Sequence, residues 1–326
     1  MRVVVAGGSG FLGSQLCEAL VSRGERVSCL DNFSSGRVAN VAHLLNLPGF
    51  ECVTCDITTR VRVSGDVDAV VHLASPASPY DYHQHPLETL AAGSRGTENL
   101  LQLAVRHRAR FVLASTSEVY GDPQVHPQTE EYWGHVNPIG PRSVYDEAKR
   151  YAEALTAAYR RSRDTDTGIV RIFNTYGPRM RAHDGRVVST FVRQALAGEP
   201  LTLHGDGSQT RSFCYVDDMV RGLIAMLDSG RPGPVNLGNP AERTVRELAE
   251  LVLAITASPS GLRFLPLPAD DPVRRRPEIT RAREQLGWRP RVPLDEGLRH
   301  TVAWFADRPE ALGQPPKPSA AAGSAS

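Results

Sequence analysis

The chain has 326 residues, of which 41% are hydrophobic and 22% are charged, and its formal net charge is +1. This balance gives no sign of a nucleic-acid partner or of an acidic solvating tail. The apolar run at the N-terminus spans only Val3 to Ala6, and no other stretch approaches the roughly 18 apolar residues that cross a bilayer. We therefore expect a cytoplasmic protein with no membrane and no nucleic acid among its partners.

The first half of the chain alternates short β-branched runs with amphipathic stretches. The expected strands are residues 2–6, 26–30, 50–54, 68–74, 110–116 and 168–173. The expected helices are residues 11–23, 96–108 and 145–163. Near-continuous apolar strands that alternate with helices are typical of a parallel sheet covered on both faces. The pattern predicts an α/β fold with a doubly wound parallel sheet of the Rossmann type.

After residue 176 the loops become longer and richer in proline and glycine, with helices expected at 187–198 and 244–255. We interpret residues 1–175 as one domain and residues 176–308 as mainly a smaller, mixed α/β domain over the carboxyl ends of the strands. Some segments of the second part are expected to return to the first. Residues 309–326 are mostly Pro, Ala, Gly and Ser without apolar periodicity, so they are predicted to form a disordered tail.

The cysteines give no sign of a metal site. Five are present, and Cys52 and Cys55 form a C-x-x-C pair. No second pair and no histidine partner follows at the spacing of a zinc site. Since cysteine commonly serves as a small buried hydrophobe, we expect these residues to be structural.

A glycine-rich turn, G-x-x-G-x-x-G, stands between the first expected strand and the first expected helix, at Gly7, Gly10 and Gly13. Such a turn lets backbone N–H groups approach a pyrophosphate, and the helix N-terminus adds partial positive charge. Asp31 ends the second strand, where a carboxylate accepts hydrogen bonds from an adenosine ribose and repels a 2′-phosphate. We therefore expect residues 1–175 to bind NAD rather than NADP, with Asp56 near the adenine.

Tyr145 and Lys149 form Y-x-x-x-K at the start of an expected helix, so both side chains lie on one face. A tyrosine with a pKa of about 10 is a poor base at neutral pH. A neighbouring ammonium and a nicotinamide cation stabilise the phenolate, which can then take a proton from a substrate hydroxyl. Thr116, at the end of a strand, is expected to hydrogen-bond the same hydroxyl, with Ser117 and Glu118 beside it.

Together these features resemble the extended short-chain dehydrogenase/reductase family, over nearly the whole chain up to about residue 308. Six stretches are similar, more narrowly, to its UDP-glucuronic acid decarboxylase (UDP-xylose synthase) branch: HLASPASP (72–79), ASTSEVYGDP (114–123), NPIGPRSVYDEAKR (137–150), RIFNTYGPRM (171–180), DGRVVSTFV (184–192) and GDGSQTRSFCYVDD (205–218). The resemblance implies an NAD-dependent lyase that converts UDP-glucuronic acid to UDP-xylose through a UDP-4-keto intermediate. It also implies a homodimer formed through the helices at 96–108 and 145–163.

The resemblance assigns residues to each ligand, with Tyr145 as the general base. For tightly bound NAD it implies contacts from Gly7, Gly10, Phe11, Leu12, Gly13, Asp31, Asn32, Phe33, Gly36, Asp56, Ile57, Leu73, Ala74, Ser75, Ser115, Tyr145 and Lys149. For the UDP-sugar it implies contacts from Pro76, Ser78, Asn99, Asn174, Val188, Arg211 and Arg275. Arg275 is expected to bind the sugar carboxylate as a bidentate fork, and Arg211 the diphosphate. Residues 186–189 and 203–205 are expected to line the uridine pocket.

The triplet Thr116-Ser117-Glu118 favours decarboxylation over the related reactions. In the 4,6-dehydratases the corresponding triplet is Thr-Asp-Glu, whose Asp protonates a departing hydroxyl, and Ser117 removes that acid. Epimerases usually carry a small neutral residue where Glu118 stands. A 4-keto glucuronic acid needs no such acid, because a β-keto acid loses CO2 to give an enolate stabilised at O4. An NAD-dependent 4,6-dehydratase or 4-epimerase stays open as an alternative, as does a non-catalytic NAD-binding regulator.

One segment departs from the family pattern. Where relatives carry K-T-N, this chain has Ala91-Ala92-Gly93. The lysine would be expected near the sugar carboxylate and the asparagine near the catalytic helix. Arg95 is a nearby cation that could compensate for the missing lysine. The local geometry is therefore expected to differ from that of the family at this segment.

Overall fold

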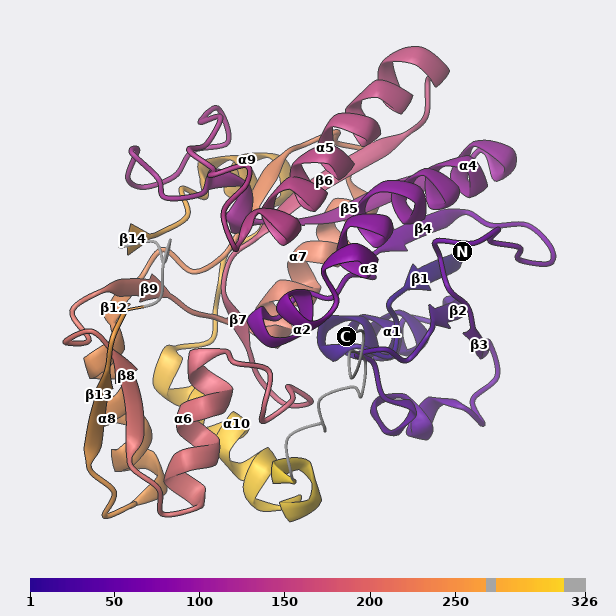
Figure 1. The fold of residues 1–326 in the computed structure, drawn as a ribbon. Helices are drawn as coiled ribbons and strands as arrows, with labels where there is room; N and C mark the ends of the chain where they lie inside the picture. Colours follow the sequence, from indigo (N-terminus) through magenta and orange to yellow (C-terminus); the bar gives the residue numbers. More distant parts are fainter. Residues whose placement is uncertain (268–273, 314–326) are drawn as a thin grey trace, which may run out of the picture.

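A seven-stranded parallel sheet forms the centre of the molecule, with the order β11-β6-β5-β4-β1-β2-β3 (Figure 1). The computed structural model describes residues 1–267 and 274–313. The strands are β1 (Arg2–Ala6), β2 (Arg26–Asp31), β3 (Phe50–Thr54), β4 (Ala69–His72), β5 (Arg110–Thr116), β6 (Thr167–Ile172) and β11 (Val235–Leu237). The order reverses between β1 and β4, and ligands of such sheets bind at the carboxyl ends of the strands beside this reversal.

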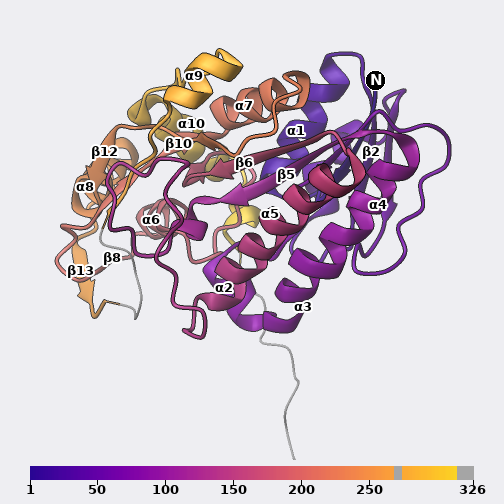
Figure 2. The ribbon, with the colours of Figure 1, turned by 90° about the horizontal axis from the view of Figure 1, so that it is seen from above.

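Helices cover both faces of this sheet, as the view along its edge shows (Figure 2). The layer on one face contains α3 (Pro86–Ala91), α4 (Thr97–His107) and α5 (Ser143–Arg163). The layer on the other face contains α1 (Phe11–Ser22), α7 (Val216–Asp228) and α9 (Thr280–Leu286). Strand β1 contributes to both cores, because Val3 and Val5 pack with one and Val4 and Ala6 with the other. The predicted doubly wound α/β fold is confirmed.

The second half of the chain adds a small mixed unit. Its helices are α6 (Val187–Leu196), α8 (Val245–Thr256) and α10 (Leu294–Ala306). Its strands are β8 (Leu201–His204) paired with β13 (Leu262–Leu265), and β9 (Thr210–Ser212) between β12 (Glu242–Thr244) and β14 (Arg274–Arg275). The pair β7 (Thr175–Tyr176) and β10 (Cys214–Tyr215) lies at the junction. Because β11 and α7 follow residue 175 yet belong to the large sheet and its layer, the division at 175 stays a prediction.

Short elements complete the chain: η1 (Val38–Asn40), η2 (Ala42–Leu44), α2 (Pro79–Gln84), the π-helical segment η3 (Ala92–Gly96), η4 (Ser117–Tyr120) and η5 (Pro309–Leu312). The predicted disordered tail does not hold for η5, because Leu312 packs against the core. The carbonyl of Leu312 also lies 3.1 Å from a ring nitrogen of His183. The rest of the predicted tail, residues 314–326, lies outside the described residues.

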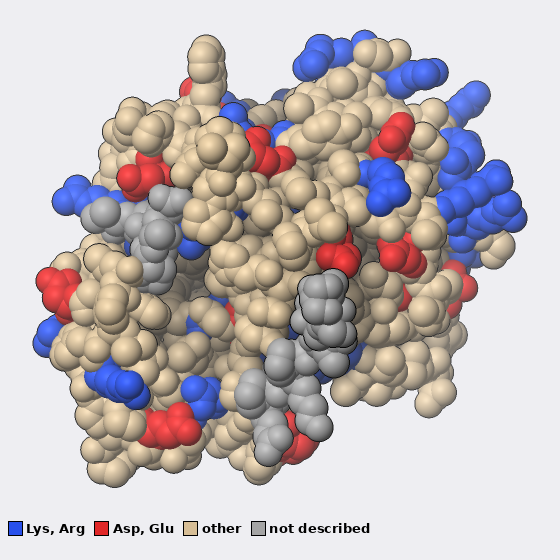
Figure 3. Space-filling view, in the orientation of Figure 1, with Lys and Arg blue, Asp and Glu red and all other residues tan. Residues whose placement is uncertain are grey.

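Cationic side chains gather along the edge of the molecule where α4 and α5 end (Figure 3). The last turns of these helices carry Arg106, Arg160, Arg161 and Arg163. Positive charge at a helix C-terminus is stabilised by the helix dipole, which accounts for the gathering without a ligand. Across residues 1–267 and 274–313, none of the helices is both long and apolar enough to cross a membrane.

Candidate active site

A cavity of about 1110 Å³ lies at the carboxyl ends of the sheet strands and extends to the small unit. Its lining includes Asp31 from β2, Thr116 from β5, Tyr145 from α5 and Arg211 from β9. Single-ligand pockets commonly measure roughly 300–1,000 Å³, so this cavity has room for more than one ligand. Of the predicted site residues, all but Phe33, Gly36 and Asn99 line it.

The glycine-rich turn is shaped by steric limits that exclude any side chain. A Cβ on Gly7 would lie 2.7 Å from the Ala74 backbone, and one on Gly13 would lie 2.0 Å from the Gly7 carbonyl oxygen. Gly10 caps helix α1 without a side-chain hydrogen bond, so the first N–H groups of the helix are not covered by a cap. This cradle fits the pyrophosphate of a dinucleotide.

Asp31 is buried and held in place by two backbone donors. The N–H groups of Ser9 and Phe33 donate to its two carboxylate oxygens at 2.9 Å each. Burial raises the pKa of Asp31, and these two hydrogen bonds act in the opposite direction. A Cβ on Gly36 would lie 2.7 Å from the carboxylate. Phe33 and Gly36 therefore contact the carboxylate of Asp31 and do not line the cavity. The carboxylate can accept hydrogen bonds from the hydroxyls of a ribose.

The end of the cavity where the adenine was expected is lined by Asp56, Ile57 and residues 73–75, which follow β4. Ser75 lines it with a buried hydroxyl that has no hydrogen-bond partner among the described residues, as expected of a group that meets a ligand. Asn99, which was expected to contact the substrate, does not line the cavity. Its amide donates to the carbonyls of Ile57 at 2.8 Å and Thr59 at 2.7 Å, so it fixes the loop that follows β3.

Tyr145 and Lys149 are both buried in the first turns of α5. The Tyr145 ring stacks on Tyr82 of α2, with centroids 5.5 Å apart and planes 8° apart. Lys149 Nζ donates to the Ala114 carbonyl at 2.8 Å and lies 5.8 Å from the centre of the Tyr145 ring. Burial lowers the pKa of Lys149 to about 8. Burial raises the pKa of Tyr145, while a hydrogen bond with Thr116 acts against that rise.

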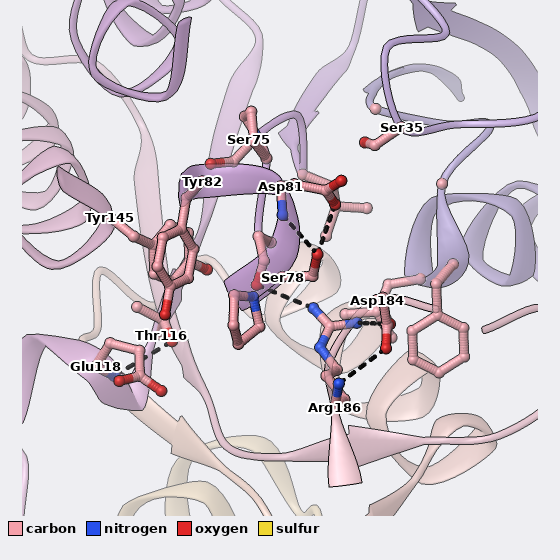
Figure 4. A pocket seen from close by; sticks show the side chains of 18 of the residues that line it. Ser35, Ser75, Ser78, Asp81, Tyr82, Thr116, Glu118, Tyr145, Asp184 and Arg186 are labelled. Carbon is pink, nitrogen blue, oxygen red and sulfur yellow. Dashed lines mark hydrogen bonds and ion pairs between the residues drawn. The ribbon is translucent and has the colours of Figure 1, made fainter. Parts of the chain in front are cut away.

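Glu118 lies beside Tyr145, Tyr82 and Thr116 on one wall of the cavity (Figure 4). Arg275 pairs with both of its carboxylate oxygens, and Arg142 Nη2 reaches one of them at 2.9 Å. Burial acts to raise the pKa of Glu118, but the two guanidinium groups outweigh it and lower the pKa to about 2. Glu118 is therefore an anchored carboxylate at neutral pH.

Arg275 was expected to face the sugar carboxylate, and the structure instead directs both its terminal nitrogens to Glu118. Its side chain is only 4% exposed, and its Nε is buried without a partner among the described residues. Arg142, which sequence reasoning missed, also lines the cavity. The wall beside Tyr145 thus carries two cations and the carboxylate of Glu118, and a second carboxyl, Asp146, interacts with all three.

Two loops from different parts of the chain meet across the cavity. Arg186 Nη2 donates to the Ala77 carbonyl at 3.1 Å, and its Nη1 lies 3.3 Å from Asp184 (Figure 4). Arg181 forms an ion pair with Asp81, which also accepts a hydrogen bond from Ser78 at 2.7 Å. The segment at Ser78 is in this way held to the start of α6, next to the part of the cavity lined by Val188, Asn174 and Arg211.

Residues 3–238 match the NAD dependent epimerase/dehydratase family. The chain belongs to this family. It is 50% identical to UDP-glucuronic acid decarboxylase 1 of Danio rerio over 323 residues, which covers 98% of this chain and 77% of the relative. It is 52% identical to UDP-glucuronic acid decarboxylase 4 of Arabidopsis thaliana, covering 94% and 69% of the two chains. The crystal structure of dTDP-glucose 4,6-dehydratase from Streptomyces venezuelae, with NAD bound, matches with a TM-score of 0.86 and 30% identity over 96% of this chain and 100% of that one.

This epimerase/dehydratase family member differs from the expected pattern at Ala91-Ala92-Gly93, where α3 passes into the π-helical segment η3. A Cβ on Gly93 would lie 2.7 Å from both the Cβ and the carbonyl oxygen of Ala148. The absent side chain therefore allows η3 to approach α5 closely, one residue before Lys149. Ala91, Ala92 and Arg95 line the cavity, so the segment also shapes its wall.

Sequence reasoning also missed Tyr82, the aromatic partner of Tyr145. Its place just after HLASPASP is a weak signal, because the two tyrosines of the short helix α2 have no distinctive spacing. Arg142 had a clearer signal, since it stands three residues before Tyr145 in the stretch NPIGPRSVYDEAKR. In both cases the missing information was which side chains meet Glu118 and Tyr145 in space.

Proposed function

We propose that this chain is a UDP-glucuronate decarboxylase that forms UDP-xylose with NAD as its bound cofactor. The observation that carries the proposal is the anchored, ionised Glu118 beside Tyr145, with Ser117 where a dehydratase needs an acid. The two relatives above, both named UDP-glucuronic acid decarboxylase, support it at 50% and 52% identity over nearly the whole chain. The carboxylate of Asp31 supports NAD over NADP, because it would repel a 2′-phosphate.

The residues beside the reacting carbon supply proton transfer and charge stabilisation. NAD, when bound, supplies a hydride acceptor for C4 of the sugar and later a hydride donor to the same carbon. Tyr145, whose phenolate Lys149 stabilises, takes the proton of the C4 hydroxyl as the C4–H bond of the sugar is broken. The product is a β-keto acid, whose carboxylate leaves as CO2 while the bonding electrons form an enolate. Tyr145 and Thr116 donate hydrogen bonds to the enolate oxygen, and C5 then takes a proton from water, which leaves hydroxide to the solvent.

The charges around Glu118 suit loss of a carboxylate. Arg142 and Arg275 attract the anionic sugar, but Glu118 already occupies both terminal nitrogens of Arg275. The reactant carboxylate is therefore not stabilised as strongly as it would be by two unpaired cations. Only interactions that are stronger in the transition state than in the reactant accelerate a step. The weaker stabilisation of the reactant carboxylate therefore favours its conversion to neutral CO2. Ser117 stands where a dehydratase carries the acid that protonates the departing hydroxyl, and Glu118, with a pKa of about 2, holds no proton to replace that acid.

The test is to incubate the purified protein with UDP-glucuronate labelled with 13C at C6, without added reductant, and to follow the products by mass spectrometry. We expect labelled CO2 and unlabelled UDP-xylose in equal amounts. Accumulation of the UDP-4-keto-pentose would show that hydride return fails. Formation of UDP-4-keto-6-deoxyglucose or UDP-galactose from UDP-glucose, with no turnover of UDP-glucuronate, would replace the proposal by a dehydratase or an epimerase. Retained NAD binding without turnover of any UDP-sugar would favour a regulator.

We further propose that two chains associate through α4 and α5. Apolar side chains of these helices are exposed in the single chain, with Val105 at 38% and Tyr151 at 52%, and Leu90 of the preceding helix α3 is 40% exposed. Burying such a surface against a second copy removes it from water. Light scattering after gel filtration should give the mass of two chains, and Tyr151→Arg should reduce it to one. The cytoplasmic location likewise remains a prediction from the sequence.

A further inference from the structure

A buried polar network connects helix α5 to strand β6 next to the Tyr145–Lys149 pair. Glu153 lies one helical turn after Lys149 and two turns after Tyr145. Its carboxylate accepts hydrogen bonds from Ser115 Oγ at 2.6 Å, from Arg171 Nε at 2.9 Å and from Arg171 Nη2 at 2.8 Å. Ser115 and Arg171 are direct partners in the pairing of β5 with β6. One carboxylate therefore joins the catalytic helix to both strands.

Arg171 also has hydrogen-bond partners other than Glu153. Its Nη1 donates to the Tyr120 hydroxyl and to the Glu130 carbonyl, both at 3.0 Å. The Tyr120 hydroxyl donates in turn to the Asn236 side chain at 2.7 Å. The guanidinium lies over the Tyr120 ring, 4.9 Å from its centre. Arg171 thus has a defined position from which it holds Glu153.

The charged and titratable groups that face Lys149 come from three elements. On α5 they are Tyr145 and Glu153, whose carboxylate acts to raise the pKa of Lys149 against the effect of burial. On β4 the group is His72, which stays neutral because burial lowers its pKa to about 3. On β6 it is Arg171, which reaches this region through Glu153. Glu153 is the anion of this group.

We propose that Glu153 is a positioning residue that keeps the buried Lys149 cationic, with Arg171 holding Glu153 in place. A cationic Lys149 stabilises the Tyr145 phenolate, so Glu153 acts on the reaction through Lys149 and touches no reacting atom. Its effect on turnover rests on the proposed function, but its effect on Lys149 does not.

The network predicts opposite effects for its two charged members. Glu153→Gln leaves two buried cations, Lys149 and Arg171, without their shared anion. Arginine does not lose its proton in proteins, so Lys149 must lose its own, and the pKa of Lys149 falls. Arg171→Gln instead frees the full charge of Glu153 to act on Lys149, and the pKa of Lys149 rises. A purely structural role for Glu153 would not produce shifts of opposite sign.

The composition of the chain makes this measurable, because its only lysines are Lys149 and Lys317. Incorporation of [6-13C]lysine gives two side-chain NMR signals, and Lys317→Arg identifies the one from Lys149. The full chain is titrated without UDP-sugar. In the unsubstituted protein Lys149 should titrate near pH 8. Glu153→Gln should lower its midpoint by at least about one pH unit, and Arg171→Gln should raise it.

Glu147→Gln is the matched control, because Glu147 lies on the same helix with its side chain 37% exposed and pairs with Arg150. It should leave the midpoint of Lys149 unchanged. Glu153→Asp, which retains the charge, should restore most of the midpoint lost in Glu153→Gln. In the turnover assay, the alkaline limb of the pH profile of Glu153→Gln should move to lower pH in step with the NMR midpoint.

An unchanged midpoint in folded Glu153→Gln would overturn the proposal. If that variant does not fold, Arg171→Gln decides, and an unchanged or lowered midpoint there overturns the proposal equally. Failure of the proposed function has a different signature. The protein would turn over no UDP-glucuronate, while the NMR midpoints of the variants would still shift as described.

Discussion

Gly93→Ala tests whether the close approach of η3 to α5, at the segment where this chain lacks the family's K-T-N pattern, sets the position of the catalytic helix. The added Cβ would meet the Cβ and the carbonyl oxygen of Ala148 at 2.7 Å, where ordinary contact begins at 3.4 Å. The two elements must therefore separate by about 0.7 Å. One of the atoms in the way is backbone, so no rotamer change relieves the contact. The displaced turn carries Lys149, the residue that follows Ala148.

Two opposing effects decide the size of the change. Replacing glycine by alanine within a helix stabilises it by about 1 kcal/mol. Forcing an extra methyl group into a packed interior costs about 1–3 kcal/mol, and the higher values apply where backbone must move. We therefore expect a net loss of about 1–2 kcal/mol in the free energy of unfolding. A misplacement of about 1 Å at a catalytic group can lower turnover by about 100-fold, so activity should fall more than stability.

The assay compares the Gly93→Ala variant with Gly261→Ala, where an added Cβ meets nothing within 4 Å. Both are examined by thermal unfolding and by turnover of UDP-glucuronate, the latter well below the melting transition. Gly261→Ala should keep the stability and activity of the parent. If Gly93→Ala is equally stable and equally active, the contact with Ala148 does not set the position of α5, and the reasoning fails.

The remaining predictions concern single side chains. Tyr145→Phe should lower turnover by about 10²–10⁴-fold while the purified protein keeps its bound NAD, and full activity would contradict the assignment of the base. Arg275→Gln leaves Glu118 with Arg142 alone, so the pKa of Glu118 should rise from about 2 and the free energy of unfolding should fall by about 3 kcal/mol, measured by denaturant titration; an unchanged stability would show that the pair is dispensable. Burial lowers the pKa of His72 to about 3, whereas the unfolded chain protonates this residue near pH 6.5. The free energy of unfolding is therefore independent of His72 above pH 6.5. It falls between pH 6.5 and 3 by up to about 1.4 kcal/mol per pH unit, because only the unfolded state gains the proton. His72→Gln should flatten this acid dependence, and an identical slope in both proteins would refute it.

The large sheet follows from local patterns in the chain. Residues 2–6, 50–54 and 110–116, predicted as strands, form β1, β3 and β5 with the same limits. The apolar, β-branched runs of β1 and β5 are almost wholly buried, as their composition predicts, and the glycine turn connects β1 to α1. Tyr145 and Lys149 likewise share one face because a helix repeats every 3.6 residues. These features depend on neighbours in the chain, so the sequence alone determined them.

The partners of the charged groups depend on contacts between distant parts of the chain. Arg275 reaches Glu118 across 157 positions, and this pairing turns an expected substrate ligand into the anchor of a carboxylate. Asn99 was expected at the substrate, but the loop after β3 passes close enough to take both of its amide hydrogens. Periodicity shows that a polar residue faces inward without showing which group it meets.

The sequence by itself therefore determined the sheet, the dinucleotide turn and the catalytic pair, and it pointed to the chemistry through Thr116-Ser117-Glu118. Only the tertiary structure decided that Glu118 is bound by Arg142 and Arg275, that Gly93 allows η3 to approach α5, and that Glu153 is held by Ser115 and Arg171. The physical reason is that strand and helix formation are set by nearby residues. The charge state of a buried group is set by whichever side chains the completed fold brings within a few ångströms of it.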